Sequence, residues 1–237
     1  MNKIIFSAVL LFIGISSFSQ SKIISDKNAQ KRNVSGFHAI NISGGIDLYL
    51  TQGNEAVAVS ASDIDVRNRI KTVVENGVLK IYLDREGFHW SWGSLHMKAY
   101  VSFKTLDKLE ASGGSDVYTE SEIMSDKLDV HLSGGSDMKA QVNIGKLNID
   151  QSGGSDVNIS GHVSNLQIDA SGGSDFHGYE LASDYCNIDA SGGSDMHVNV
   201  NKELNVVASG GSDVYYKGSA VVRKMSTSGS SSISKKG

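Results

Sequence analysis

The pentapeptide Ser-Gly-Gly-Ser-Asp occurs six times in the 237-residue chain, and its spacing constrains the fold more than any other feature. The copies begin at Ser112, Ser133, Ser152, Ser171, Ser191 and Ser209. The intervals between them are 21, 19, 19, 20 and 18 residues, so the period is near 19 and varies slightly in length. A repeat of this length is typical of a solenoid, in which each unit buries its apolar face against its neighbours.

Residues on both sides of the motif alternate between apolar and polar. The position after each Asp is always apolar, and the next position is polar or amphipathic: Tyr118, Lys139, Asn158, His177, His197 and Tyr215. Three residues before each motif stand Leu109, Val130, Ile149, Ile168, Ile188 and Val206. This period of two predicts one strand entering the motif and one leaving it, with the glycines forming a tight corner. A looser return loop, such as residues 160–162, would complete each rung.

The first 19 residues have the pattern of a secretory signal peptide, with Lys3 before an apolar run and small residues at positions 17 and 19. The run is too short to span a membrane, and no later segment reaches 18 apolar residues. We therefore expect an exported protein without a transmembrane segment, located in the periplasm, at the cell surface or outside the cell. Residues 20–33 are expected to be flexible. Residues 34–237 form one domain, with irregular rungs at 34–109, regular rungs at 110–216 and a cap or tail at 217–237.

Charge is distributed unevenly along the chain, although the formal net charge is only −4. Residues 110–215 carry 17 acidic and 4 basic side chains, whereas residues 20–109 and 216–237 together carry 9 acidic and 17 basic ones. An acidic repeat region disfavours nucleic acid as a partner and favours cations or cationic partners. The alternative is that these carboxylates only keep an exposed solenoid soluble.

The motif aspartates are expected to form a ladder along one side of the stack: Asp116, Asp137, Asp156, Asp175, Asp195 and Asp213. Rungs about 4.8 Å apart would make neighbouring carboxylates repel by about 0.9 kcal/mol in water. One interpretation is that each Asp accepts backbone N–H groups of its own turn and stays hydrated. The other is a Ca²⁺ site assisted by Asp150, Asp169 and Asp189, since carboxylate oxygens are calcium ligands.

An aromatic segment is the second candidate site. Phe88, His89, Trp90, Trp92 and His96 lie between two predicted strands, and the segment holds both tryptophans of the chain. Aromatic side chains on a loop suit a carbohydrate or a protein surface as ligand. The alternative is that the segment folds back as a cap over an open end of the core.

No catalytic motif is found. The chain has no nucleophile elbow, P-loop or zinc-type spacing, and carboxylates that recur in every rung indicate structure rather than a catalytic pair. His177 and His197 share one outward column. One interpretation is a surface metal site, but the favoured one is that they are exposed side chains without a ligand. Cys186, the only cysteine, replaces leucine in a core column, so we expect a buried, inert thiol and no cofactor.

Several segments in order resemble the secreted family of the putative auto-transporter adhesin "head GIN domain". They are Gly36–Ile40 (GFHAI), Ser43–Leu50 (SGGIDLYL), Gln52-Gly53, Val73–Ile81 (VVENGVLKI), Val101–Phe103 (VSF) and Leu106–Gly113 (LDKLEASG). The resemblance covers residue 34 to the C-terminus. It implies a pectin-lyase-like parallel β-helix, Gly-Ser turns joining two sheets, no catalytic residues and an adhesion role, in a family common in Bacteroidetes.

We thus expect an all-β, single-stranded, right-handed parallel β-helix with rungs of about 19 residues. The expected function is a non-enzymatic binding or adhesion module. Two other classes stay open: a polysaccharide-active β-helix lyase or hydrolase, and a structural envelope protein that assembles end to end as a homo-oligomer.

Overall fold

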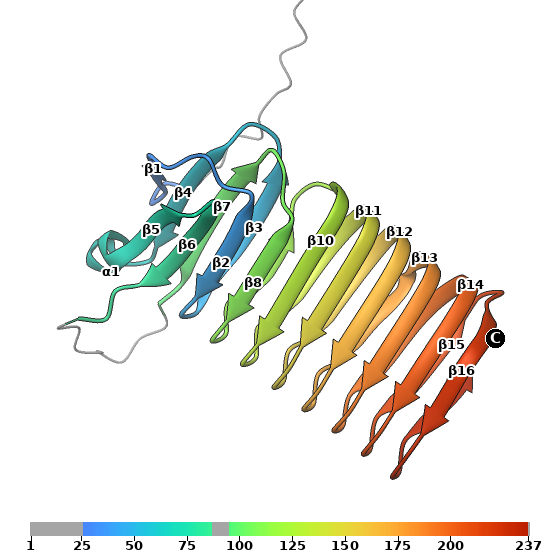
Figure 1. Ribbon diagram of the computed structural model, residues 1–237. Helices are drawn as coiled ribbons and strands as arrows, with labels where there is room; N and C mark the ends of the chain where they lie inside the picture. The colour runs from blue at the N-terminus through green and yellow to red at the C-terminus, as the bar shows by residue number, and fades with distance from the viewer. Residues whose placement is uncertain (1–25, 87–94, 237) are drawn as a thin grey trace, which may run out of the picture.

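The computed structural model describes residues 26–86 and 95–236 as an all-β solenoid whose turns stack along one axis (Figure 1). The seventeen strands of these residues belong to one hydrogen-bonded network, because several of them continue from one face of the solenoid to the other. The turns repeat about every 19 residues, which confirms the period read from the sequence. The short helix α1 (Ile64–Arg69) lies at the N-terminal end. Within the described ranges, no helix is long and apolar enough to span a membrane.

The regular turns consist of long strands, each paired in parallel with the strands of the neighbouring turns: β10 (Ile123–Ser133), β11 (Met138–Gln151), β12 (Val157–Ala170), β13 (Phe176–Ala190) and β14 (Asp195–Ala208). Leu128, Leu147, Leu166, Cys186 and Leu204 align along the stack and are all buried. The predicted alternation of inward apolar and outward polar residues is therefore confirmed.

The return side of each turn is tighter than the expected loop. Instead of a loop at residues 160–162, β12 keeps its parallel pairing with β11 from Ser160 to Val163. Gly161 makes this bend with φ of 114°, and a Cβ there would lie 2.0 Å from the Val142 carbonyl oxygen. Only glycine therefore fits this inner position. Register shifts between β13 and β14 absorb the unequal lengths of the 20- and 18-residue intervals.

The N-terminal turns are stacked in a different order from their order in the chain. β2 (Ala39–Ser43) pairs in parallel with both β6 (Val78–Leu83) and β8 (Lys108–Ser112). β3 (Ile46–Gln52) likewise pairs with β7 (Met97–Phe103) and β9 (Val117–Thr119). The turn formed by β2 and β3 is thus inserted between two turns that follow it in sequence.

Antiparallel strands finish the N-terminal end of the stack. β4 (Ala56–Ala61) runs antiparallel to β7, and β1 (Gln30–Arg32) runs antiparallel to β4. On the other face, β5 (Ile70–Glu75) pairs antiparallel with β6 through the hairpin turn at Asn76-Gly77. These strands cover the edges that the parallel turns would otherwise expose.

The structure differs from two expectations at the ends of the domain. Residues 30–32 of the segment expected to be flexible are held in β1 by pairing with residues 57–59. At the other end, β15 (Asp213–Lys217), β16 (Val221–Thr227) and β17 (Ser232–Lys235) extend the solenoid by parallel pairing, where a cap or tail is expected from residue 217. Residues 1–19, for which the sequence predicts a signal peptide, lie outside the described residues.

The interior is apolar apart from several buried serines and one buried amide. Side chains such as Phe103, Leu109 and Phe176 are fully buried between the two faces. Gln151 is also fully buried, in a column whose neighbours are Leu132 and Ala170. Its side-chain oxygen and nitrogen have no hydrogen-bond partner among the described residues. A buried amide without partners destabilises the fold.

Candidate binding face

The second serine of each motif points into the solenoid and is fully buried: Ser115, Ser136, Ser155, Ser174, Ser194 and Ser212. In the later copies its Oγ donates to the carbonyl oxygen of the first serine, as from Ser155 to Ser152 at 3.0 Å and from Ser212 to Ser209 at 2.8 Å. The motif thus satisfies its own buried hydroxyl, and this serine is unavailable to a ligand.

The two glycines of the motif have different roles in the C-terminal turns. Gly172 has φ of 82°, and a Cβ on it would lie 2.6 Å from the Gly153 carbonyl oxygen. Gly173 lies outside the left-handed region, and its nearest contact would be at 4.0 Å. Its N–H donates to the same Gly153 oxygen at 2.8 Å. The first glycine is therefore required by the corner, whereas the second position tolerates a side chain.

Two degenerate copies of the corner lie beyond the six exact ones. Ser43–Asp47 (SGGID) precedes them, and Ser228–Ser232 (SGSSS) follows them. Ser231 repeats the internal bond of the motif by donating from Oγ to the Ser228 carbonyl oxygen at 2.8 Å. Sequence reasoning missed the last copy because its Asp is replaced by Ser232. The 19-residue distance from Ser209 to Ser228 is the signal that could have found it.

The motif aspartates form the expected ladder, but their hydrogen bonds run between turns. Oδ1 of Asp116, Asp137, Asp156 and Asp175 each accepts the backbone N–H of the next motif Asp, at 3.0–3.2 Å. Oδ1 of Asp213 accepts the N–H of Ser232 in the same way, at 3.1 Å. At these five positions the expected turn within one rung is thus replaced by a bond from one rung to the next, whereas the N–H of Asp213 donates to the carbonyl oxygen of Ser194 at 3.1 Å.

Repulsion between neighbouring carboxylates of the ladder contributes to a raised pKa at two positions. Burial raises the pKa of Asp137, and the charges of Asp116 and Asp156 raise it further, against the lowering effect of the Asp156 N–H. At the first position of the ladder, burial and the charge of Asp116 raise the pKa of Asp47. The backbone hydrogen bonds therefore hold together carboxylates that repel one another.

The calcium hypothesis has no supporting cluster in the described part of the chain, where no three His, Cys, Asp or Glu side chains are placed to hold a metal ion. Asp150, Asp169 and Asp189 align with one another on strands that enter the corner. The ladder aspartates lie at or beside the start of strands that leave it. The two sets of carboxylates therefore lie on different faces of the solenoid and do not form a joint site.

A column of rings and polar side chains runs beside the ladder. The predicted outward positions are in register: Tyr118, Lys139, Asn158, His177, His197 and Tyr215. Tyr100 and Tyr49 extend the column at one end and Ser234 at the other, and the sequence analysis did not include these three. Tyr49 stacks between Tyr100 and Tyr118, with ring centroids 5.3 Å apart on each side. Rings therefore occur at both ends of the column, with Lys139 and Asn158 between them.

The stacking of the rings determines which of their atoms are available to a ligand. His197 lies between His177 at 5.5 Å and Tyr215 at 5.1 Å, and Tyr179 contacts its edge at 5.0 Å. Lys236 lies 4.5 Å from the Tyr215 ring centroid. Because the rings face one another along the stack, they present edges and polar atoms outward. This arrangement favours hydrogen bonding over the flat stacking of a sugar ring.

His177 and His197 are neighbours as predicted, but His197 is tightly packed. Its Nδ1 is buried and has no hydrogen-bond partner among the described residues. Burial and the neighbouring His177 lower the pKa of His197, although Asp195 and Asp175 act in the opposite direction. The neutral ring is therefore the favoured form at neutral pH.

A depression of about 370 Å³ lies over the middle of this face. It is lined by Tyr49, Tyr118, Thr119, Glu120, Lys139, Ala140, Gln141, Asn158 and Ser160. Hydroxyl, amide, carboxylate and ammonium groups thus meet between the ladder and the return corner. We call this surface, together with the ladder and the ring column, the ladder face.

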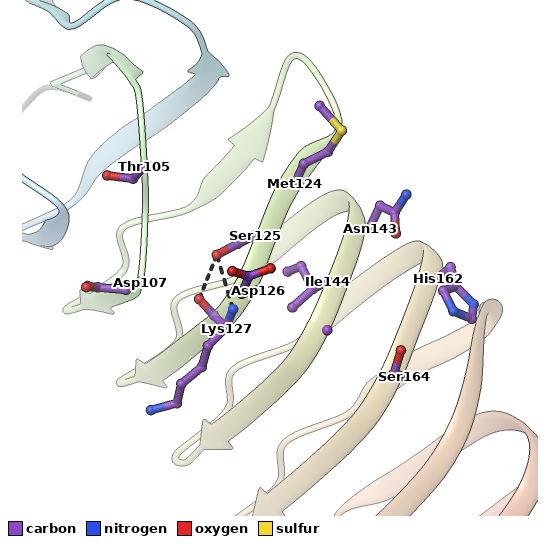
Figure 2. A pocket seen from close by; sticks show the side chains of 11 residues that line it. Thr105, Asp107, Met124, Ser125, Asp126, Lys127, Asn143, Ile144, His162 and Ser164 are labelled. Carbon is purple, nitrogen blue, oxygen red and sulfur yellow. Dashed lines mark hydrogen bonds between the residues drawn. The ribbon is translucent and has the colours of Figure 1, made fainter.

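A second depression of about 740 Å³ lies on the return side of the solenoid (Figure 2). Its lining includes Thr105, Asp107, Met124, Asp126, Lys127, Asn143, His162 and Ser164. Met124 is 59% exposed, yet its backbone is fixed by Gln52, whose Oε1 accepts the Met124 N–H at 2.8 Å and whose Nε2 donates to the Met124 oxygen at 2.9 Å. An exposed methionine side chain on a fixed backbone, beside polar groups, offers an apolar contact point.

Of the five residues of the predicted aromatic site, the structure describes His96. Phe88, His89, Trp90 and Trp92 lie outside the described residues. His96 is exposed and close enough to Asp47 that its charge lowers the pKa of that carboxyl, against the larger effect of burial. His96 therefore belongs to the N-terminal end of the ladder face.

Cys186 is 1% exposed, which confirms the predicted burial of the thiol. Burial raises its pKa well above the ordinary value. The thiolate is therefore disfavoured.

Comparisons with known proteins agree with this architecture. Residues 36–220 match the family described as "Putative auto-transporter adhesin, head GIN domain". No curated protein matches the chain.

Several solved structures share the fold. A putative adhesin from Bacteroides fragilis NCTC 9343 is 20% identical with a TM-score of 0.80, and the match covers 88% of this chain and 96% of that one. A "putative lipid binding protein" from Parabacteroides distasonis ATCC 8503 is 19% identical with a TM-score of 0.68, covering 90% and 98%. A putative adhesin from Parabacteroides merdae ATCC 43184 is 16% identical with a TM-score of 0.68, covering 88% and 95%. At these identities the likeness is one of fold.

Proposed function

Since the chain belongs to the "Putative auto-transporter adhesin, head GIN domain" family, we propose that it is an exported adhesion module that binds through its ladder face. The binding is non-enzymatic, and the ligand is a polar one, a carbohydrate or a protein surface. The N-terminal sequence with the pattern of a signal peptide supports export to the periplasm, the cell surface or the medium.

The observation that carries this proposal is the regular array on the ladder face. Carboxylates, ring edges and polar side chains recur in register from turn to turn, on strands fixed by parallel pairing. A rigid array of donors and acceptors loses little conformational entropy when it binds an extended ligand. The acidic character of residues 110–215 favours a ligand that carries cationic or hydroxyl groups.

The enzyme alternative lacks a specific observation in its favour. The ladder aspartates recur in every turn, and Oδ1 of most of them is occupied by the next backbone N–H. A general acid or nucleophile would need an environment unlike that of its neighbours. This is the reason for preferring binding over catalysis.

End-to-end assembly is opposed by basic side chains on the terminal strands. The last turn carries Arg223, Lys224 and Lys235, while the N-terminal end carries Lys31 and Arg32. Lysine and arginine on an edge strand oppose edge-to-edge pairing.

The test is a binding screen of the purified full chain on immobilised polysaccharides and host surface proteins, with release of reducing or unsaturated ends measured in parallel. The face variant Gln141→Ala with Asn158→Ala, which removes two polar groups of the depression without changing the charge, should lose at least tenfold in affinity. Gln167→Ala, on the outward side of the other sheet, is the matched control and should bind like the wild type.

Equal affinity of the face variant and the control would contradict binding through the ladder face. Product release that depends on a ladder aspartate would establish the enzyme alternative instead. These two results are distinct, because retention and product release are measured on the same samples.

A further inference from the structure

We propose that Arg32 and Arg67 form a binding site for a tetrahedral oxyanion, a phosphate or sulfate group, at the N-terminal end of the solenoid. This site lies apart from the regular turns that carry the ladder, and its existence does not depend on the function proposed above.

The two arginines are brought together by the antiparallel end of the fold. Arg32 is the last residue of β1, and Arg67 lies in the last turn of α1. Nη2 of Arg32 donates to the carbonyl oxygen of Arg67 at 2.9 Å, and Nη1 of Arg67 donates to the carbonyl oxygen of Asn28 at 3.0 Å. The Asn28 amide in turn donates to the Ala61 carbonyl oxygen at 3.2 Å. Both guanidinium groups are therefore held in place before any ligand arrives.

No carboxylate neutralises this pair. Among the described residues, neither arginine forms an ion pair, whereas Arg223 at the other end of the molecule contacts Glu203 at 3.2 Å. The ranges outside the description, residues 1–25, 87–94 and 237, contain no Asp or Glu. All acidic side chains of the chain are thus accounted for, and none lies within ion-pair distance of Arg32 or Arg67.

Both side chains are half-buried, and this makes the unpaired charges costly. The Nε atoms of Arg32 and Arg67 are buried without a hydrogen-bond partner in the described structure. Burial lowers the pKa of Arg32, and the charge of Arg67 lowers it further. Two like charges removed from water without a counter-ion are unfavourable, so an anion between them would offset both effects.

The free donors define the ligand class. Nη1 of Arg32 has no acceptor among the described residues, and Nη2 of Arg67 has only a long contact of 3.5 Å to Asn68. Guanidinium groups bind phosphate and sulfate oxygens with paired N–H bonds, and a tetrahedral anion has enough oxygens for two arginines. Exposed Lys27 and Lys31 add positive charge nearby. A lipid headgroup and a free ion offer the same chemistry.

The experiment is thermal unfolding of the full chain in sodium phosphate, sodium sulfate and sodium chloride at equal ionic strength. For an anion at about ten times its Kd, linkage predicts a rise in Tm of about 3 °C over chloride. Arg32→Gln and Arg67→Gln should remove this rise, and Arg223→Gln should retain it. Each variant is compared with itself in chloride, so a change in its basal stability does not affect the result.

Sedimentation with vesicles distinguishes the two sources. Binding to vesicles containing about 30% phosphatidylglycerol, but not to pure phosphatidylcholine, with loss in Arg32→Gln and Arg67→Gln, identifies a lipid headgroup. A phosphate effect without vesicle binding identifies a free or soluble ester ligand. The proposal is overturned if neither probe acts on the wild type, or if both arginine variants respond as the wild type does.

Discussion

Asp137 and Asp156 are joined across adjacent turns by two hydrogen bonds that run in opposite directions. The backbone N–H of Asp156 donates to Oδ1 of Asp137 at 3.0 Å, while the carbonyl oxygen of Asp156 accepts the N–H of Met138, the residue after Asp137, at 2.8 Å. The same pair of bonds joins Asp116 to Asp137 and Asp156 to Asp175. At these corners the motif Asp therefore adds one hydrogen bond to those that join the parallel strands.

Two substitutions of Asp137 distinguish its role as a hydrogen-bond acceptor from the effect of its negative charge. Asp137→Asn keeps the Oδ1 acceptor and removes repulsion with Asp116 and Asp156, so we expect a Tm equal to or above that of the wild type. Asp137→Ala removes the acceptor and should cost about 0.5–1 kcal/mol, because the Asp156 N–H loses its partner at a solvent-exposed corner. Chemical denaturation of both variants measures the difference. A less stable Asn variant together with an unchanged Ala variant would contradict the assigned role.

The pH dependence of the Asn substitution follows from the raised pKa of Asp137. The folded state binds this proton more tightly than the unfolded state does, so ionised Asp137 destabilises the fold at neutral pH. This destabilisation decreases as pH falls through the folded pKa and is lost below the unfolded value of 3.8. The advantage of Asp137→Asn over the wild type should therefore be largest at neutral pH and vanish near pH 3. Thermal unfolding across this range checks it.

Asp129 is the matched control, because the shift of its pKa has the opposite sign. Burial alone would raise the pKa of Asp129, but bonds from Lys127 Nζ and Asn148 Nδ2, both at 2.6 Å, lower it overall. Its contribution is present above the unfolded pKa and is lost as pH falls through the folded one. Asp129→Asn should thus be less stable than the wild type at pH 7 and equal to it near pH 3. Parallel pH profiles for the two variants would refute the argument.

Gln151 is expected to lower the stability of the native protein. Its buried amide has no partner among the described residues, and Leu132 fills the same column one turn earlier. Gln151→Leu should raise the free energy of unfolding by about 1–3 kcal/mol, which corresponds to several degrees in Tm. Gln167→Leu makes the same chemical change on the outer surface and should give no comparable gain. A destabilised Gln151→Leu variant would indicate that the amide has a partner, such as an internal water molecule.

The two glycines of one corner provide a further pair of variants. Gly172→Ala places a Cβ 2.6 Å from the Gly153 carbonyl oxygen at a φ of 82°, so we expect a loss of at least about 2 kcal/mol. Gly173→Ala meets nothing closer than 4.0 Å and should stay within about 0.5 kcal/mol of the wild type. Denaturant titration of both variants measures this contrast, and equal losses would contradict it.

The regular part of the fold could be predicted because its information is local and repeated. The repeat of about 19 residues, the alternation of apolar and polar side chains and the paired glycines are all visible in a single rung and its neighbours. Together they place Leu147, Leu166 and Cys186 in one core column without any knowledge of the rest of the chain. The N-terminal order could not be read in this way, because β2 lies between β6 and β8 only through long-range pairing. Local alternation does not specify which strand lies next to which.

The candidate site was predicted in part. The ladder and the outward column follow from the register of the repeat, and both are confirmed. The direction of the aspartate bonds was not predicted, because an Asp at a corner can accept an N–H from its own turn or from the next. Arg32 and Arg67 were also missed, since 35 residues separate them and only the antiparallel end of the fold brings them together.

The most direct test of the structural role of the motif compares the wild type with the triple variant Asp137→Asn, Asp156→Asn, Asp175→Asn, each unfolded thermally in chelator and in about 5 mM Ca²⁺ at constant ionic strength. If the ladder aspartates act as acceptors for the next turn, the triple variant folds with a Tm at or above that of the wild type, and Ca²⁺ shifts neither protein by more than about 1 °C. A rise of several degrees with Ca²⁺ in the wild type that is absent from the triple variant would show instead that the ladder holds cations.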